Sequence, residues 1–317
     1  MLYLCLVSLP LTGCKEGLMS ILVVGSIAYD SVETPNAKVE DALGGSTLFF
    51  SAAASLFSAV NVVGVVGTDF KRDDLSFLEQ RGVNFDGLQI EEGETFRWGG
   101  RYHENMNQRD TLFTLLNVFE SFSPKIPEQY KDSEYIFLAN IDPDLQLDVL
   151  QQIHKPKLVV LDTMNFWISG KRDSLEKIVR KSDIVIINDE ELLQFTEEDN
   201  LIHAAKALVA YGPSSIVIKR GEFGALLFSN NKFFFAPAYP LENVVDPTGA
   251  GDTFAGGFLG YLSAQQNIND KTLRNAILYG CVAASFTVED FSFNKLIHLE
   301  PKLLEERVLK LKEMMSF

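Results

Sequence analysis

The chain has 317 residues, with 28 lysines and arginines against 43 aspartates and glutamates, which gives a formal net charge of −15. This acidic balance argues against non-specific binding of nucleic acid, because such binding needs basic side chains that displace the counterions of the phosphates. Hydrophobic residues make up 46% of the chain, enough to fill a core, so a wholly disordered chain is excluded.

The first 18 residues differ in character from those that follow. They are apolar and contain a cysteine motif typical of an export signal, but no lysine or arginine precedes the apolar run. Met19 stands directly before a strand-like run, so we favour a misplaced start codon for residues 1–18 over a signal segment. The folded domain is then expected at residues 19–317. No stretch reaches the roughly 18 apolar residues that span a bilayer, and we expect a cytoplasmic protein without membrane contact.

Short apolar runs alternate with helical patterns along most of the chain. The apolar runs are hydrophobic on both faces, as expected of parallel strands that helices cover on each side. They lie at Ile21–Val24, Val62–Val66, Tyr135–Leu138, Leu158–Leu161, Ile184–Ile187 and Ile216–Ile218. Helical patterns lie between them, at Leu48–Phe57, Asp74–Gln80, Leu145–Ile153, Ser174–Val179 and Leu201–Val209. The alternation predicts an α/β fold with a mostly parallel sheet.

Two regions break this alternation. From about residue 87 to residue 119 the pattern is strand-like and polar, and residues 32–41 share this character. We expect these segments to form a small accessory β-sheet that acts as a lid over a cleft. Residues Ala225–Ala236 predict a β-hairpin that turns at Asn230 and Asn231.

Several common motifs are missing from the sequence. The Walker A pattern, the dinucleotide fingerprint G-x-G-x-x-G, the zinc motif H-E-x-x-H and the G-x-S-x-G elbow do not occur. The four histidines are far apart in the sequence and form no metal-binding spacing. The chemistry therefore has to come from another kind of site.

The sequence DPTGAGDTFAGGF, residues 246–258, predicts a glycine turn that opens a helix. Gly249 and Gly251 permit backbone conformations closed to other residues, and with Ala250 they let a ligand approach the peptide N–H groups. Such N–H groups are unpaired at a helix N-terminus, where the helix dipole adds about half a positive charge. We therefore expect an anion hole for a phosphoryl group in this turn.

Asp252 lies at the mouth of the expected anion hole. A carboxylate there can take the proton from a hydroxyl that attacks phosphorus, and such general-base help is typically worth about 10²–10⁴ in rate. The alternative interpretation gives Asp252 only the role of a helix cap and the glycines only that of a turn. The neighbouring Asp246 and Thr248 and the small residues that follow favour the catalytic interpretation.

The same segment resembles the C-terminal signature of the ribokinase-like (PfkB) carbohydrate kinase family. Other parts of the chain agree with the family in the same order, from Met19 to the C-terminal region. The resemblance implies a ribokinase-like three-layer α/β/α sandwich with a small β-sheet lid. It implies that Asp252 is the catalytic base and that residues 249–251 form the anion hole. Asp246 and Thr248 match positions that bind a monovalent cation, such as K⁺, in many members.

The substrate side of the resemblance depends on two short segments. The motif GSIAYD ends in Asp30 and resembles a family segment whose aspartate hydrogen-bonds sugar hydroxyls, so Asp30 is the expected substrate anchor. Gly44 and Gly45 resemble a glycine pair that lets the backbone approach the substrate. An asparagine that commonly touches the substrate is missing after this pair, and Phe49 and Phe50 nearby indicate a more apolar pocket.

The nucleotide side of the resemblance depends on two loops that follow buried strands. Asn188 and Glu191 match the family's N-x-x-E motif, which implies that Glu191 holds Mg²⁺ through water and that Asn188 contacts the phosphates. An ordinary acidic helix start is the alternative interpretation. Lys219, Gly221 and Gly224 match the family's nucleotide loop, whose backbone lines the ATP site.

The implied activity is an ATP- and Mg²⁺-dependent phosphotransferase that moves the γ-phosphoryl group of ATP to a hydroxyl of a small sugar or polyol. A nucleoside kinase, with aromatic side chains near Phe49 stacked on the base, and a non-catalytic binding protein are the alternatives. The intact Asp252 and N-x-x-E motif argue against the last. Arg97, Arg101 and Tyr102 in the expected lid either reach the substrate or are exposed sheet residues. Many relatives dimerise through the lid, which makes a homodimer the expected assembly.

Overall fold

The computed structural model describes residues 20–316, and the predictions made for residues 1–18 lie outside this range. A nine-stranded sheet forms its centre, in the order β13-β12-β11-β10-β9-β8-β1-β4-β5. All neighbouring strands are parallel except at β12, which is antiparallel to both of its neighbours. The strands are β1 (Ile21–Val24), β4 (Val60–Gly67), β5 (Val83–Glu91), β8 (Tyr135–Leu138), β9 (Leu158–Asp162), β10 (Ile184–Asn188), β11 (Ser215–Lys219), β12 (Ala225–Ser229) and β13 (Lys232–Ala236).

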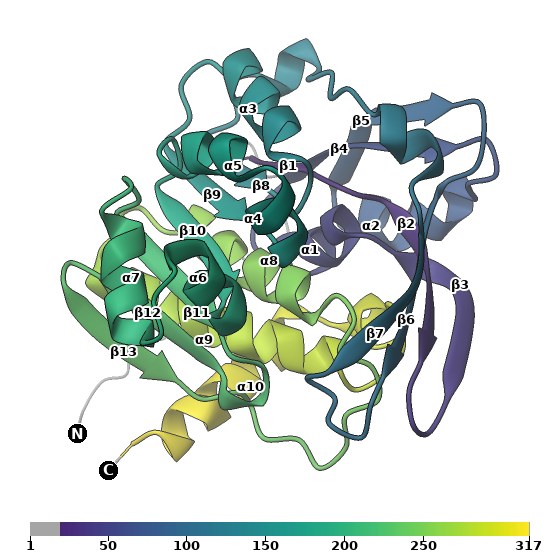
Figure 1. The fold of residues 1–317 in the computed structure, drawn as a ribbon. Helices are drawn as coiled ribbons and strands as arrows, with labels where there is room; N and C mark the ends of the chain where they lie inside the picture. The colour runs from purple at the N-terminus through teal and green to yellow at the C-terminus, as the bar shows by residue number, and fades with distance from the viewer. Residues whose placement is uncertain (1–19, 317) are drawn as a thin grey trace.

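Helices cover both faces of this sheet, which gives the three layers seen in Figure 1. Side chains of β1 alternate between the layers, with Ile21 and Val23 in one core cluster and Leu22 and Val24 in the other. One face packs against α1 (Ser46–Ala54), α2 (Ser76–Gln80), α8 (Ala250–Ser263), α9 (Asp270–Thr287) and α10 (Pro301–Met314). The other packs against α3 (Pro143–Gln152), α4 (Asn165–Gly170), α5 (Arg172–Val179), α6 (Asp189–Thr196) and α7 (Leu201–Val209).

The predicted strands and the predicted hairpin are confirmed. Each apolar run lies within a strand, and β12 and β13 are joined by Asn230 and Asn231, whose φ angles are 49° and 57°. Two successive left-handed residues make the tight turn that suits the twist of a hairpin. The predicted helix Leu48–Phe57 begins earlier, at Ser46, and ends at Ala54, because the chain closes there into shorter turns.

A second, four-stranded sheet lies beside the large one, in the order β3-β2-β6-β7 (Figure 1). Its strands are β2 (Ala28–Glu33), β3 (Lys38–Gly44), β6 (Phe96–Tyr102) and β7 (Arg109–Leu115). The pairs β2–β3 and β6–β7 are antiparallel, whereas β2 and β6 run parallel. We call this sheet the small sheet. The first part of the predicted lid segment 87–119 differs from expectation, since residues up to Glu91 belong to β5, which is hydrogen-bonded to β4 in the large sheet.

The register of the small sheet assigns its side chains to two faces. Asp30 lies beside Trp98, and Tyr102 lies opposite Arg109, so these four share one face, which we call the inner face. The residues between them point to the opposite, outer face.

No helix in residues 20–316 is long and apolar enough to cross a membrane.

Candidate active site

Three polar side chains gather where adjacent parallel strands of the large sheet end. β9 ends at Asp162, β10 ends at Asn188, and β11 ends at Lys219, with Asn188 directly beside Lys219 in the register. The carboxyl ends of parallel strands meet at one edge of a sheet, which is where open α/β folds bind ligands. Lys219 Nζ lies 3.0 Å from Asp162 Oδ1, and these two side chains are only 19% and 6% exposed. Asp162 was not among the site residues predicted from the sequence.

The buried Lys219 remains a cation. Burial alone would lower its pKa, but the carboxylates of Asp162, Glu191 and Asp252 outweigh burial and raise the pKa of Lys219 above its usual value. A Cβ placed on Gly251 would lie 3.3 Å from Lys219 Nζ, so the ammonium stands beside the first turn of α8. A fixed positive charge at this position is suited to phosphate oxygens.

The turn before α8 is held by its own polar groups. Asp246, which is 2% exposed, accepts a hydrogen bond from Thr248 N at 2.8 Å, and Val245 N donates to the carbonyl of Val288 at 2.8 Å. Gly249 then adopts a left-handed conformation with φ 75° and is followed by the first helical residue. A Cβ on Gly249 would also overlap the ring of Phe49, so this position accepts only glycine.

Only some of the backbone amides of this turn donate hydrogen bonds to other groups of the protein. Ala250 N donates to the carbonyl of Pro247 at 3.2 Å, whereas the amides of Gly249 and Gly251 find no partner in the described part of the chain. Two unpaired amides at the start of a 14-residue helix can receive an anion. The part of Ala250 in the predicted anion hole is therefore weaker than that of its two glycine neighbours.

Asp252 lies in the first turn of α8, partly exposed and beside these amides. The pKa of Asp252 is raised to about 7, chiefly by burial and also by the carboxylate of Asp162, while the charges of Lys219 and Arg109 act to lower it. A carboxylate with this pKa is ionised in about half of the molecules near neutral pH, which is the condition for an effective general base.

Asn188 and Glu191 form a reciprocal cap at the start of α6. Asn188 Oδ1 accepts from Glu191 N at 2.7 Å, and Glu191 Oε2 accepts from Asn188 N at 3.0 Å. This motif therefore does cap an acidic helix start, as the alternative interpretation predicts. One carboxylate oxygen of Glu191 is left over, and burial raises the pKa of Glu191 to about 7 while Lys219 lowers it.

The segment after β11, Arg220–Gly224, is called the nucleotide loop below. Arg220 N donates to the carbonyl of Gly224 at 2.8 Å, which closes the loop on itself. Gly221 and Gly224 both have positive φ angles, of 52° and 85°. The loop starts at Lys219, so the structure brings these predicted nucleotide-binding residues to the same strand end as Asp162 and Asn188.

Asp30 approaches the site from the inner face of the small sheet. The pKa of Asp30 is raised to about 7, chiefly by burial and also by the carboxylates of Asp246 and Asp252, while a hydrogen bond from the Gly45 backbone acts to lower it. A Cβ on Gly44 would overlap the carboxyl group of Asp30, so the glycine pair makes room for this side chain. The predicted substrate anchor and the predicted base therefore lie in one electrostatic neighbourhood.

The side chains of β6 divide between the two faces of the small sheet. Tyr102 Oη lies 3.2 Å from Thr248 Oγ1, so the inner face meets the turn that precedes α8. On the outer face, Arg97 pairs with Asp69 at 2.7 Å and Arg101 pairs with Glu33 at 3.0 Å. Of the three lid residues considered in the sequence, only Tyr102 faces the site.

Contrary to the expectation from the sequence, Phe49 and Phe50 do not line an apolar pocket. Phe49 is 2% exposed and stacks on Phe293 with ring centroids 4.4 Å apart, and Phe50 stacks on Phe137 at 4.3 Å. Both rings belong to the core beneath the site. The partly exposed indole of Trp98, beside Asp30, is the aromatic surface that the site offers, and the sequence analysis missed it.

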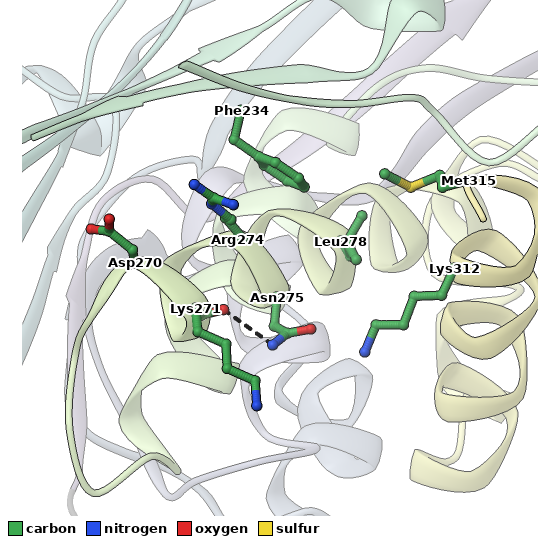
Figure 2. A pocket seen from close by; sticks show the side chains of 8 residues that line it. All are labelled: Phe234, Asp270, Lys271, Arg274, Asn275, Leu278, Lys312 and Met315. Carbon is green, nitrogen blue, oxygen red and sulfur yellow. Dashed lines mark hydrogen bonds between the residues drawn. The ribbon is translucent and has the colours of Figure 1, made fainter. Parts of the chain in front are cut away.

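A separate hollow of about 470 Å³ lies between β13, α9 and α10 (Figure 2). Arg274 lies 5.5 Å from the centre of the Phe234 ring, and Lys271 and Lys312 extend from the two helices. Nearby, Asn230 of the hairpin turn donates to Asp270 at 2.7 Å, at the opposite end of these strands from the nucleotide loop. None of the predicted site residues lines this hollow, whose walls are Phe234, Asp270, Lys271, Arg274, Asn275, Leu278, Lys312 and Met315.

Comparison with known proteins agrees with this arrangement. The profile of the pfkB family carbohydrate kinases matches residues 19–297. The chain belongs to this family. A cytidine kinase of Thermococcus kodakarensis is 33% identical over 248 residues, which cover 76% of this chain and 88% of that protein.

Solved structures of the ribokinase family share the fold of this pfkB-family kinase. The nucleoside kinase of Methanocaldococcus jannaschii aligns with a TM-score of 0.74 at 21% identity, covering 92% of this chain and 99% of that one. Ribokinase from Thermotoga maritima aligns with a TM-score of 0.70 at 21% identity, with coverage of 92% and 99%. The resemblance seen in the sequence and the α/β fold are thus confirmed, and the protein is a sugar or nucleoside kinase that phosphorylates a hydroxyl group.

Kinases of this family use ATP with Mg²⁺, and the chain's residues fit that ion only through water. No group of three or more His, Cys, Asp or Glu side chains within residues 20–316 could hold a metal ion by itself. Glu191 has one free carboxylate oxygen, which suits an ion that keeps most of its hydration shell. At the predicted cation site, Asp246 already accepts hydrogen bonds from Thr248 and from the Ser292 backbone, so those bonds account for its buried carboxylate.

Proposed function

We propose that this kinase transfers the γ-phosphoryl group of ATP to a hydroxyl of a nucleoside. Asp252 serves as the general base and the turn at residues 249–251 as the anion hole. The observation that carries this proposal is that Asp252, beside unpaired amides, interacts electrostatically with both Lys219 at the end of β11 and Asp30 of the small sheet. In the proposed reaction Asp252 acts on the acceptor hydroxyl, Lys219 on the phosphates and Asp30 on the substrate.

The roles of these residues follow from their positions. Asp30 accepts hydrogen bonds from the acceptor's hydroxyl groups and holds the attacking oxygen near Asp252. Asp252 takes the proton as that oxygen attacks phosphorus, and ADP leaves on the opposite side. Lys219 and the amides of Gly249 and Gly251 bind the oxygens on which charge gathers, while Asn188 donates its side-chain amide to the phosphates.

When Mg²⁺ is bound together with ATP, it would neutralise part of the charge of the phosphates. Glu191 would hold a water of this ion through its free oxygen, and Gly221 and Gly224 would line the nucleotide with their backbone. Asp246 and Thr248 remain the candidate residues for a monovalent cation such as K⁺. The inner face of the small sheet closes the acceptor side and keeps water from the phosphoryl group.

Two observations support a nucleoside rather than a free sugar as the acceptor. The Thermococcus relative is named a cytidine kinase, and a nucleoside kinase shares the fold. Trp98 presents a partly exposed indole beside Asp30, where a base attached to the bound ribose can stack. A sugar or polyol, as ribokinase uses, is the second candidate, because Asp30 would recognise the hydroxyl groups of either.

An acceptor panel tests this proposal. The protein is given MgATP together with cytidine, uridine, adenosine, ribose, fructose or a polyol, and ADP release is measured. We expect ADP release above the acceptor-free rate with at least one nucleoside. Turnover only with sugars would favour the second candidate. Tight binding of ATP without turnover on any acceptor would support a non-catalytic protein instead.

We also propose a homodimer formed through the outer face of the small sheet. β7 is exposed along its whole length, and Phe113 and Leu115 point to the outer face beside Gly99 and Arg97. Exposed apolar side chains on an edge strand favour association with a second copy.

A further inference from the structure

Arg109 was not among the residues predicted from the sequence, yet it points toward the candidate active site. It lies opposite Tyr102 in the β6–β7 ladder, on the inner face that also carries Asp30. Its guanidinium group lies 5.2 Å from the centre of the Trp98 ring, which holds it against the sheet. The side chain is nevertheless exposed, as expected of a group that faces an open cleft.

The hairpin that carries Arg109 touches the phosphate side of the site at two points. Tyr102 Oη lies 3.2 Å from Thr248 Oγ1, immediately before the anion-hole turn. Asn107, near the tip of the hairpin, donates to Glu222 of the nucleotide loop at 3.1 Å. Arg109 lies directly opposite Tyr102 and two residues after Asn107, so it belongs to the part of the hairpin that both contacts hold against the site.

The guanidinium group of Arg109 has a hydrogen bond with the neutral Tyr102 side chain but no ion-pair partner in the described part of the chain. Among residues 20–316 no carboxylate lies within ion-pair distance of its guanidinium group, whereas Arg97 and Arg101 of the same small sheet are both paired. Its charge nevertheless lowers the pKa of Asp30, Glu191 and Asp252. In the proposed function these three carboxylates mark the acceptor, the metal and the base, so Arg109 lies within electrostatic reach of all three.

We propose that Arg109 is a further catalytic residue, which binds the phosphoryl group during its transfer. This inference depends on the proposed function. As the acceptor oxygen forms its bond to phosphorus and gives its proton to Asp252, the bond from phosphorus to the bridging oxygen breaks and its electron pair leaves with ADP. Arg109 donates two N–H groups to non-bridging oxygens of the group in transit, from the side opposite Lys219.

An anionic acceptor is the other ligand that an unpaired arginine could serve. The acceptor side of the site already holds the carboxylates of Asp30, Asp246 and Asp252, which would repel a negatively charged acceptor. In the proposed reaction the phosphoryl group lies beside Lys219 and the open amides, where the arginine would add to an existing positive field. The geometry therefore favours the phosphoryl group over the acceptor as the partner of Arg109.

The test compares Arg109→Met and Arg109→Lys with Arg101→Met, a matched variant on the outer face of the same hairpin. Steady-state rates are measured with the best acceptor of the panel, and binding of MgADP with and without tetrafluoroaluminate is measured in the presence of that acceptor. For Arg109→Met we expect kcat to fall about 10²–10³-fold, as for the loss of one donor to a developing charge. The affinity for the tetrafluoroaluminate complex should fall by a similar factor, with the affinity for MgADP and the acceptor KM unchanged.

Arg109→Lys should lie between the wild type and Arg109→Met, because it keeps the charge but loses the two-pronged geometry. Arg101→Met should match the wild type. An unchanged kcat in Arg109→Met would overturn the inference, and so would a loss confined to the acceptor KM, which would indicate an anionic acceptor. If the wild type itself phosphorylates no acceptor, the proposed function fails instead.

Discussion

The carboxylates of Asp30, Glu191 and Asp252 share one electrostatic neighbourhood. Burial raises the pKa of each to about 7, and the charge of Arg109 opposes that rise at all three. The carboxylate of Asp252 also raises the pKa of Asp30, so these two groups titrate as a coupled pair rather than one by one. The consequence at the scale of single residues is that the reactive form of the site is made or lost near neutral pH.

We predict that kcat/KM for the acceptor rises with pH through about 7. Asp252 acts as a base only when it is ionised, and a pKa of about 7 means that lowering the pH from 8 to 6 removes roughly nine-tenths of the ionised form. Titration of Asp30 over the same range makes the fall steeper than that of a single group. The measurement is a pH–rate profile at low acceptor concentration, with ATP affinity followed as a control. A flat profile between pH 5.5 and 8.5 would rule out this role of the raised pKa.

At the scale of single elements, the start of α8 depends on a glycine. Both the backbone conformation at this position and the neighbouring ring of Phe49 exclude other residues. Gly249 has a φ of 75°, and the ring of Phe49 occupies the space that a Cβ would need. Phe49 cannot move easily, because it is buried and stacked on Phe293. The position of the anion-hole amides is therefore fixed from below by the packing of α1.

We predict that Gly249→Ala destabilises the protein and removes most of its activity. The left-handed conformation costs a residue with a Cβ about 1–2 kcal/mol, and the contact with Phe49 shifts the turn. Thermal unfolding and ADP release measure the two effects. Gly170→Ala is the matched control, since a Cβ there meets open space at the end of α4. Wild-type turnover in Gly249→Ala would show that the turn need not keep its conformation.

The sequence predicted those site residues that follow buried strands or open helices. Apolar runs located β10 and β11, so Asn188 and Lys219 could be placed at strand ends from local pattern alone. Asp162 follows the run Leu158–Leu161 in the same way and could have been found by the same reasoning. The helix-cap and metal interpretations of Asn188 could not be separated, because the capping bonds leave an oxygen of Glu191 free for water.

Arg109 and Trp98 could not be predicted, because their direction depends on pairing between distant segments. β2 pairs with β6 in parallel, and the register of β6 with β7 shifts between Gly99 and Gly100. A shift of one residue moves every later side chain to the other face of a sheet. Only the three-dimensional pairing shows that Arg109 faces the site while Arg101 does not.

At the scale of the whole molecule, the outer face of the small sheet carries exposed apolar side chains near the site. Leu112, Phe113 and Leu115 on β7 are 47%, 37% and 47% exposed. A second copy packed on this face would cover the edge strand and brace the hairpin that carries Arg109. Association would then stabilise the closed arrangement of the small sheet over the site.

We predict that the protein elutes as a dimer, with about twice the 35.4 kDa of one chain. Replacing Phe113 and Leu115 together by serine should give a monomer, because it removes the apolar contact while leaving the fold of the large sheet intact. Light scattering after size-exclusion chromatography measures the mass. Phe166→Ser, at a residue that is 62% exposed on α4, is the control and should leave the dimer unchanged. A wild-type monomer at all concentrations would refute the assembly.

The most direct test of the whole account is the transfer of labelled γ-phosphoryl from ATP to a nucleoside by the wild type and by Asp252→Asn. The substitution keeps the size of the side chain but removes its ability to take a proton. We predict that the wild type forms labelled nucleoside phosphate, and that Asp252→Asn binds MgATP equally well but turns over about 10²–10⁴-fold more slowly. Transfer by Asp252→Asn at the wild-type rate would contradict the account, because the acceptor would then lose its proton without residue 252.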